Sequence, residues 1–224
     1  MDDTKMTPKI PVIDLFAGGG GFSQGVHLTN THEVVLCFEW WDRGLAIHYH
    51  NFPETKHVQM TLGGDVKEFC DQIRGFVKKF GYEDNYHFHG SPPCQSFSIA
   101  NRQENHNNLE TNDKSNLTTW FLEVVADLNP PTWSLENVPA VINYLKQEKH
   151  PILEDKEIRF YDRVYGYEFG APTMRKRVFI GKGIDLGPFT VRMNNKRNRV
   201  DNDDIVSMIG ADFSSPNPFQ KLLA

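Results

Sequence analysis

A glycine run near the amino terminus constrains the fold more than any other feature of this sequence. An apolar, β-branched run at residues 9–16 leads into four consecutive glycines at residues 18–21, and the stretch after them, to about Leu28, can form a helix. Glycine accepts positive φ and lets the backbone turn sharply or approach a ligand closely. The pattern therefore predicts a strand, a tight turn and a helix, the unit that begins a doubly wound sheet.

Strands and helices alternate along the rest of the chain. Further apolar runs that predict strands lie at residues 34–38, 86–89 and 132–135. Helical spacing of apolar residues occurs at residues 42–50, 65–80, 117–128 and 140–149. A closing pair of strands is expected at 159–169 and 178–181 around a turn at Pro172, and a polar, Asn-rich loop is expected at 99–115. The alternation predicts an α/β fold, a doubly wound, Rossmann-like, mostly parallel sheet with ligands at the carboxyl ends of its strands.

The cysteines favour a reduced, intracellular setting. Only Cys37, Cys70 and Cys94 occur, with no CxxC pair and no spacing of a zinc ligand set. The amino terminus has no basic region followed by an apolar run, and no stretch approaches the roughly 18 apolar residues of a membrane span. We expect a protein that is neither secreted nor membrane-bound, cytoplasmic in a bacterium or phage and nuclear in a eukaryote, with Cys37 and Cys70 as buried structural thiols.

The nine histidines do not suggest a metal site. His87 and His89 alternate on one predicted strand, and His48 and His50 lie at the end of a predicted helix. No cysteine or carboxylate stands near them at a ligand spacing, so we expect no metal.

Basic residues gather in one segment although the net charge of the chain is -5. Residues 173–200 hold eight Lys and Arg against a single acid, Asp185. Such a segment is either a footprint for a polyanion or a solvated basic face. The alternating pattern ends after Gly183. We therefore divide the chain into a folded domain at residues 1–183 and a basic, loop-like segment at residues 184–224.

The glycine turn is a candidate cofactor loop. It does not match GxGxxG, because counting from Gly18 puts Ser23 in the last glycine position, and a dehydrogenase is therefore disfavoured. Glu39, at the end of the second predicted strand, is placed to accept hydrogen bonds from a ribose diol, and Trp40 offers a flat surface for a purine. Asp65 is placed to accept from an exocyclic amine. The plain alternatives are a helix cap for the acids, a core position for the tryptophan and a turn without a ligand for the glycines.

A cysteine follows the strand expected at residues 86–89. The sequence Gly90-Ser91-Pro92-Pro93-Cys94 must leave regular structure, because of its proline pair. A lone cysteine is usually an inert buried residue, but this one lies in a rigid, irregular loop. Glu136 ends a later predicted strand, so a thiol and a carboxylic acid are expected to meet at the edge of the sheet.

Taken in order, these motifs resemble those of the cytosine-5 DNA methyltransferases over roughly residues 10–181. The segments that carry the resemblance are Asp14-Leu15-Phe16-Ala17-Gly18-Gly19-Gly20-Gly21-Phe22-Ser23, Glu39-Trp40, Asp65, residues 90–98 with a Pro-Cys-Gln centre, Glu136-Asn137-Val138, and Gly170-Ala171-Pro172-Thr173-Met174-Arg175-Lys176-Arg177. The resemblance implies the fold of S-adenosylmethionine-dependent methyltransferases and transfer of a methyl group from S-adenosyl-L-methionine to C5 of cytosine in DNA.

The resemblance also assigns roles to individual residues. Cys94 would add to C6 of cytosine as a transient covalent nucleophile, Glu136 would act as the acid at N3, and Arg177 would hold O2. The expected cofactor contacts are Phe16, Gly18, Gly20, Gly21, Phe22, Glu39, Trp40, Asp65, Pro92 and Leu117. The expected DNA contacts are Gln95, Ser96, Ser98, Arg175 and Arg177. The partner would be duplex DNA with the target cytosine flipped out, because C6 is inaccessible in a stacked duplex.

The sequence departs from the family pattern in three places. Thr173 stands where the family has glutamine, residues 113–117 follow the pattern only loosely, and only 43 residues follow Gly181, where the family continues with a target-recognition region and two further motifs. Residues 1–183 would then be the catalytic methyltransferase domain, and 184–224 a remnant of the recognition region. Two alternatives stay open. One is a silent or split subunit that needs a carboxyl-terminal partner chain, and the other is an RNA cytosine-5 methyltransferase, although the Cys-Phe-Thr signature of that branch is absent.

Overall fold

The structure of the protein is a computed structural model that describes residues 8–93, 112–169 and 173–185. Its strands are β1 (Ile10–Leu15), β2 (His32–Glu39), β3 (Lys56–Gln59), β4 (His87–Gly90), β5 (Thr132–Asn137), β6 (Ile158–Tyr165) and β7 (Lys176–Lys182). Its helices are α1 (Gly21–Thr29), α2 (Asp42–Asn51), α3 (Val66–Phe80), α4 (Asn112–Leu128) and α5 (Ala140–Gln147), with short 3-10 turns η4 (Pro151–Leu153) and η5 (Gly166–Phe169).

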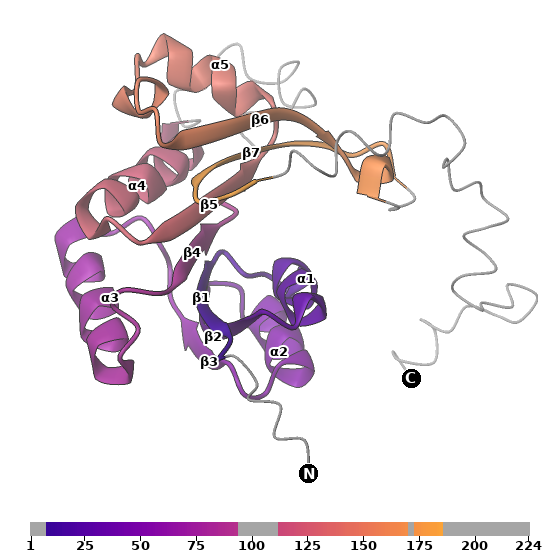
Figure 1. Ribbon diagram of the computed structural model, residues 1–224, viewed down its shortest axis with the longest axis vertical. Coiled ribbons are helices and arrows are strands. Elements are labelled where there is room, and N and C mark those ends of the chain that lie inside the picture. Colours follow the sequence, from indigo (N-terminus) through magenta and orange to yellow (C-terminus); the bar gives the residue numbers. More distant parts are fainter. Residues whose placement is uncertain (1–7, 94–111, 170–172, 186–224) are drawn as a thin grey trace, which may run out of the picture. The chain divides into compact units, whose positions relative to one another are not determined.

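The described strands form one seven-stranded sheet in the order β3-β2-β1-β4-β5-β7-β6 (Figure 1). All pairs from β3 to β5 are parallel, and β7 runs antiparallel to β5. Helices α1 and α2 cover one face of the sheet, and α3 and α4 cover the other (Figure 1). The prediction of a mostly parallel α/β sheet with helices on both faces is therefore confirmed.

Contacts divide the chain into two compact units. The first comprises residues up to Asp162 together with Val178–Asp185, and the second includes Arg163–Arg177. Within the second unit, the Gly166 amide donates to the Arg175 carbonyl at 2.9 Å, which closes the turn that leads from β6 to β7. In the part of the chain that the structure describes, no helix is both long and apolar enough to cross a membrane.

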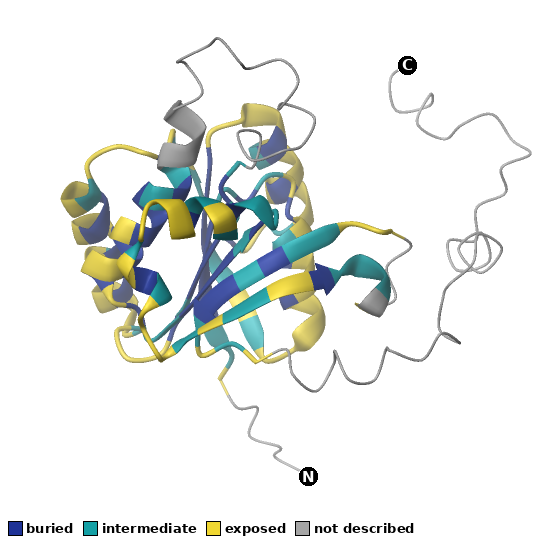
Figure 2. Cartoon of the chain, turned by 90° about the horizontal axis from the view of Figure 1, so that it is seen from above, coloured by how far each residue is buried: buried dark blue, intermediate teal, exposed yellow. Residues whose placement is uncertain are grey.

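The hydrophobic core of the first unit lies where α3 and α4 pack on the sheet. The Phe69 ring lies 5.2 Å from Phe38 and 5.1 Å from Trp120, measured between ring centroids. Phe121 stacks on Phe88 at 5.6 Å. Burying an aromatic side chain of this size contributes about 1.5–3 kcal/mol. Figure 2 shows the consequence, with buried strands between helices whose outer faces are exposed.

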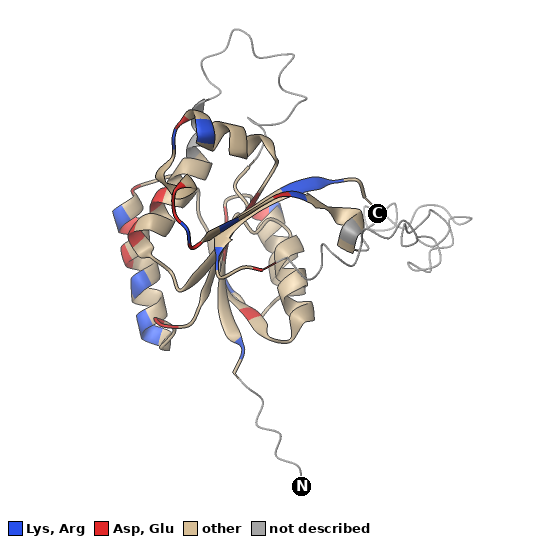
Figure 3. Cartoon of the chain, turned by 45° about the horizontal axis from the view of Figure 1, so that its top comes forward, with Lys and Arg blue, Asp and Glu red and all other residues tan. Residues whose placement is uncertain are grey.

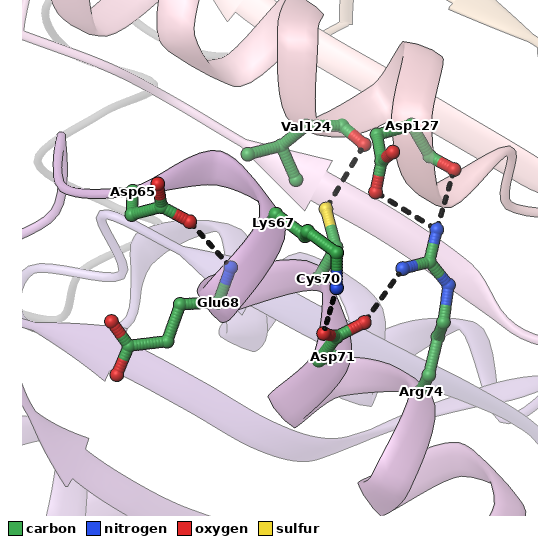
Figure 4. Close-up of polar contacts among 8 residues, drawn as sticks. All are labelled: Asp65, Lys67, Glu68, Cys70, Asp71, Arg74, Val124 and Asp127. Atoms are coloured by element: carbon green, nitrogen blue, oxygen red, sulfur yellow. Dashed lines mark hydrogen bonds and ion pairs between the residues drawn. The ribbon is translucent and has the colours of Figure 1, made fainter.

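Helix α3 agrees with the helix predicted for residues 65–80 from the spacing of its apolar residues. Its buried residues are Phe69, Cys70, Ile73 and Val77, which recur at the helical spacing. Basic and acidic residues are interspersed on the outside of the helices that cover this face (Figure 3). The Arg74 guanidinium donates to the Asp127 carboxylate of α4 at 2.8 Å (Figure 4). Because that pair is half-exposed, it contributes only about 0–1 kcal/mol, and the buried face dominates.

Two sequence expectations change. Helix α4 begins at Asn112, so the polar loop expected at residues 99–115 overlaps its first turn. Strand β3 was not predicted, because it contains a single apolar residue, Val58. Residues 99–111 and the turn at Pro172 lie outside the described residues.

Candidate functional site

The register of the sheet brings three strand ends to one edge. Leu15 of β1 pairs with Gly90 of β4, and Gly90 in turn pairs with Leu135 of β5. The residues that come next, Phe16, Ser91 and Glu136, therefore follow at the same edge. In open α/β sheets this carboxyl edge is where ligands bind. The structure thus places the glycine loop, the start of the cysteine loop and the acid on neighbouring strands.

The glycine loop has the left-handed backbone that its composition predicts. Phe16, Gly18 and Gly20 have φ values of 61°, 54° and 97°. A Cβ on Gly20 would lie 2.6 Å from the Phe52 ring, so only glycine fits there. A Cβ on Gly18 would meet nothing within 4 Å, so its backbone is open to a ligand.

Glu39 holds the glycine loop in place. Its carboxylate is buried and accepts hydrogen bonds from the Gly18 amide at 2.7 Å and from the Trp41 amide at 2.9 Å. Each oxygen keeps a further lone pair, so the same carboxylate is able to accept from a diol. Sequence reasoning found the acid but missed its two backbone partners, because Gly18 lies 21 residues away.

The candidate residues for the adenine side of the site are Trp40, Asp65 at the amino-terminal cap of α3, and Trp120 in α4. Trp40 is 62% exposed and is not a core residue. Asp65 caps α3, with one carboxylate oxygen accepting from the Glu68 amide at 2.7 Å (Figure 4), which leaves its second oxygen for another donor. The Trp120 indole donates to the Gly64 carbonyl at 2.8 Å. A small cavity of about 120 Å³ lies between Asp65 and Trp120.

Leu117 and Phe16 complete this wall. A Cβ on Gly63 would come within 2.8 Å of the Leu117 side chain, so Leu117 packs on the loop that carries Asp65. The Phe16 ring meets Trp120 edge-on at 6.4 Å. Leu117 therefore lies beside the loop that carries Asp65, and Phe16 lies beside Trp120, while contact of either residue with a cofactor stays a prediction.

Phe22 contributes to the site through packing. Its ring stacks on His89 at 3.5 Å between centroids and 9° between planes. His89 is buried and its nitrogens lie 2.8 Å from the Ser134 hydroxyl and 2.9 Å from the Ser91 hydroxyl. Burial lowers the pKa of His89 well below its usual value, so the ring is neutral. Sequence reasoning did not foresee this buried polar cluster, which connects α1, β4 and β5.

The residues that precede Cys94 are fixed from both sides. The Ser91 amide donates to the Leu15 carbonyl at 3.3 Å. The buried Asn137 side chain donates to the Pro92 carbonyl at 3.3 Å and uses its own oxygen to accept from the Val138 amide at 2.8 Å. Asn137 was recognised only as part of a motif, and its role as an anchor of the cysteine loop comes from the structure. Cys94, Gln95, Ser96 and Ser98 themselves lie outside the described residues.

Glu136 lies in β5, Arg177 lies in β7, and Arg175 immediately precedes β7. Glu136 is partly buried and pairs in register with Phe179 of β7. Arg175 is exposed, and its amide donates to the Thr173 hydroxyl at 3.1 Å. The Arg177 guanidinium donates to the Lys176 carbonyl at 2.8 Å. Both arginines belong to the second unit, and of the basic segment at residues 173–200 only the part up to Asp185 is described.

A family model and several known proteins match the sequence of this chain. A family model described as C-5 cytosine-specific DNA methylase matches residues 10–203. The chain is 29% identical over 154 residues to the type II methyltransferase M.HindV of Haemophilus influenzae, covering 69% of this chain and 44% of that protein. It is 26% identical over 209 residues to the type II methyltransferase M.AquIA of Picosynechococcus sp., covering 85% of this chain and 80% of that protein.

Solved structures of similar proteins show the same fold. A DNA modification methyltransferase encoded within a prophage of E. coli superposes with a TM-score of 0.59 at 30% identity, covering 77% of this chain and 46% of that one. The Dnmt2 methyltransferase of S. pombe superposes with a TM-score of 0.54 at 18% identity, covering 78% of this chain and 50% of that one. The chain therefore spans about half the length of most of these relatives.

Proposed function

The chain belongs to the C-5 cytosine-specific DNA methylases, and we propose that it transfers a methyl group from S-adenosyl-L-methionine to C5 of a flipped-out cytosine in duplex DNA. The observation that carries the proposal is the shared edge of β1, β4 and β5. There the Glu39-held glycine loop, the Asn137-held start of the Cys94 loop, and Glu136 are neighbours.

The residues of the site suit S-adenosyl-L-methionine. Glu39 offers acceptors for the ribose hydroxyls, Trp40 a free aromatic face for adenine, and Asp65 an acceptor for the adenine amine. The backbone of Gly18 is open for close approach of the methionine part. When bound, the cofactor supplies an electrophilic methyl group.

The protein groups make the cytosine reactive. We assign Cys94 as the nucleophile that adds to C6, while Glu136 shares a proton with N3 and Arg177 stabilises the negative charge that develops at O2. The adduct has a nucleophilic C5, which accepts the methyl group. Loss of the C5 proton then expels the Cys94 thiolate and restores the aromatic ring. The Asn137 contact with Pro92 serves this chemistry by fixing the base of the nucleophile loop.

The basic segment is assigned to the nucleic acid. Arg175 is exposed at the beginning of the eight basic residues between 173 and 200. We assign to Arg175 a contact with the phosphate backbone, to Gln95, Ser96 and Ser98 contacts around the flipped base, and to residues 184–224 a share in target recognition. Phosphate contacts of this kind supply affinity that falls as salt rises.

Trapping with a modified base tests the reaction. The full chain is mixed with S-adenosyl-L-methionine and duplex DNA that carries 5-fluorocytosine in many sequence contexts. Fluorine at C5 cannot leave as a proton does, so the covalent intermediate should accumulate as a protein–DNA adduct that survives denaturation. The adduct should disappear in Cys94→Ala and remain in Cys70→Ala, whose thiol is buried at the α3–α4 contact.

Three outcomes would contradict the proposal. An adduct that persists in Cys94→Ala would show that another residue is the nucleophile. Absence of any adduct with the wild-type chain, together with normal binding of S-adenosyl-L-methionine, would indicate a silent or split subunit, and adduct formation with RNA alone would change the substrate.

Replacing Trp40 with Ala is expected to weaken cofactor binding by roughly 10- to 100-fold, because aromatic stacking on a base contributes about 1–3 kcal/mol. The free energy of unfolding should not change, since the side chain is 62% exposed. Calorimetric titration with S-adenosyl-L-methionine measures the first quantity and urea denaturation the second. Tyr49→Ala, which removes a ring that is 60% exposed on α2, serves as the control and should bind the cofactor normally. Equal affinities for wild type and Trp40→Ala would remove Trp40 from the site.

A further inference from the structure

Three potential metal ligands from different elements meet beside the cofactor loop. They are Cys37 of β2, His48 of α2 and His57 of β3 (Figure 1). The Cys37 sulfur lies 3.9 Å from His48 Nδ1, and His48 Nδ1 lies 2.8 Å from His57 Nε2. The sequence analysis predicts no metal, because these residues do not stand at a ligand spacing along the chain. The fold brings them together, and all three donor atoms lie within 4.8 Å of one another.

A buried hydrogen-bond chain fixes the orientation of the central histidine. The Ser23 hydroxyl donates to the Asp14 carboxylate at 3.0 Å, so its oxygen accepts from His48 Nε2 at 2.9 Å. With Asp14 ionised, this chain of bonds puts the proton of the neutral His48 ring on Nε2, so that the lone pair of Nδ1 points toward the sulfur and the second imidazole. Metal-binding histidines are held in the same way, with the remote N–H bonded to a polar group that is itself anchored.

Burial affects the ionisation of all three side chains. Burial and the neighbouring His57 lower the pKa of His48 to about 4, and burial lowers that of His57. Burial, together with the charges of Asp14 and Glu39, raises the pKa of the Cys37 thiol to about 12. Both imidazoles are therefore neutral and the thiol is protonated in the structure without an ion.

We propose that Cys37, His48 and His57 bind one divalent metal ion of the zinc type, as a structural site independent of methyl transfer. Nitrogen and thiolate donors select Zn²⁺ and its spectroscopic substitute Co²⁺ over Mg²⁺ or Ca²⁺. A tetrahedral ion with ordinary zinc bonds would hold the two nitrogens about 3.3 Å apart and the sulfur about 3.5 Å from each. Two of the three separations, 2.8 Å and 3.9 Å, reach those values with shifts of about half an ångström, and the third, between the Cys37 sulfur and His57, lies within 4.8 Å and must close further.

A bound ion would link several elements on one side of the sheet. It joins β2, α2 and β3 directly and reaches α1 and β1 through Ser23 and Asp14. His48 also lies against the glycine loop, since a Cβ on Gly20 would be 3.2 Å from its ring. Binding replaces the thiol proton of Cys37, which passes to solvent. The bound ion should therefore raise the midpoint of thermal unfolding.

Cobalt titration of the reduced full-length chain tests the proposal. A thiolate-to-cobalt charge-transfer band in the near ultraviolet should grow and saturate at one ion per chain. The band should vanish in Cys37→Ser and remain in Cys70→Ser and Cys94→Ser. Loss of an outer-shell partner typically costs 10–100-fold in metal affinity, so loss of the ligand in His57→Gln should cost at least about 100-fold. His50→Gln, which changes an exposed histidine of the same helix, should bind normally.

Three results would exclude the site. They are no band from the wild-type chain at a several-fold excess of Co²⁺, a band that persists in Cys37→Ser, and a band that is lost in Cys94→Ser. If Cys37→Ser fails to fold, X-ray absorption at the zinc edge of the wild-type chain decides instead. One sulfur and two imidazole neighbours support the proposal, whereas a shell without sulfur contradicts it.

Discussion

Replacing Glu39 with Gln is expected to weaken S-adenosyl-L-methionine binding by at least about 100-fold, which corresponds to about 2.8 kcal/mol. The change keeps the shape of the side chain but turns one carboxylate oxygen into an NH₂ group. That group must face the N–H of either Gly18 or Trp41, since each oxygen of Glu39 accepts from one of them. A buried donor left without an acceptor costs about 1–3 kcal/mol, and the ribose loses a charged acceptor as well.

Two measurements distinguish a loss of cofactor binding from a loss of stability. Calorimetric titration gives the affinity for the cofactor, and urea denaturation gives the free energy of unfolding, which should fall by about 1–3 kcal/mol. Asp42→Asn is the matched control, because Asp42 is an exposed acid nearby whose oxygen accepts from the adjacent Arg43 amide at 2.8 Å. A Glu39→Gln chain that binds the cofactor within about threefold of wild type would exclude Glu39 from the site.

Replacing Gly90 with Ala should lower the free energy of unfolding by about 3 kcal/mol, at the upper end of the range for overpacking a core. The added Cβ would lie 2.6 Å from Cδ2 of Phe121. Phe121 is fully buried between Phe88 and Trp133, with ring centroids 5.6 Å and 6.3 Å away, so it has no free space to move into. The end of β4 must shift instead, and it carries the cysteine loop. Methyl transfer should therefore fall even where the variant is folded.

Gly75→Ala is the control, and its free energy of unfolding is expected to rise rather than fall. Gly75 is exposed on α3, and a Cβ there would meet nothing within 4 Å. Alanine in a helix is favoured over glycine by about 0.5–1 kcal/mol, so this variant should be slightly more stable than wild type. Urea denaturation and the adduct assay report both variants. Gly90→Ala with wild-type stability and activity would show that the close packing of Phe121 on Gly90 is not required.

Much of the fold could be predicted because it rests on local patterns. The glycine turn after β1 and the periodic α3 are visible in a few consecutive residues, and parallel topology then brings Phe16, Ser91 and Glu136 to one edge. Strand β3 escaped prediction because an edge strand needs little apolar surface, and His57 within it is only partly buried.

The polar interior could not be predicted for a different reason. Asn137 finds the Pro92 carbonyl 45 residues away, and His48 finds Cys37 from another element. Hydrophobic periodicity indicates which face of an element is buried but not which polar atoms meet within it. Such contacts depend on strand register and helix placement, which single residues do not encode.

The central position of β1 has a consequence for the order in which the chain can fold during synthesis. β1 pairs with β2 soon after it is made, but its other edge is completed only by β4, at His87–Gly90. Until then a nascent chain exposes the open edge of an almost wholly buried, apolar strand. Unpaired edges of this kind recruit other chains and promote aggregation. Until β4 has left the ribosome, this open edge of β1 is therefore available for pairing with other chains.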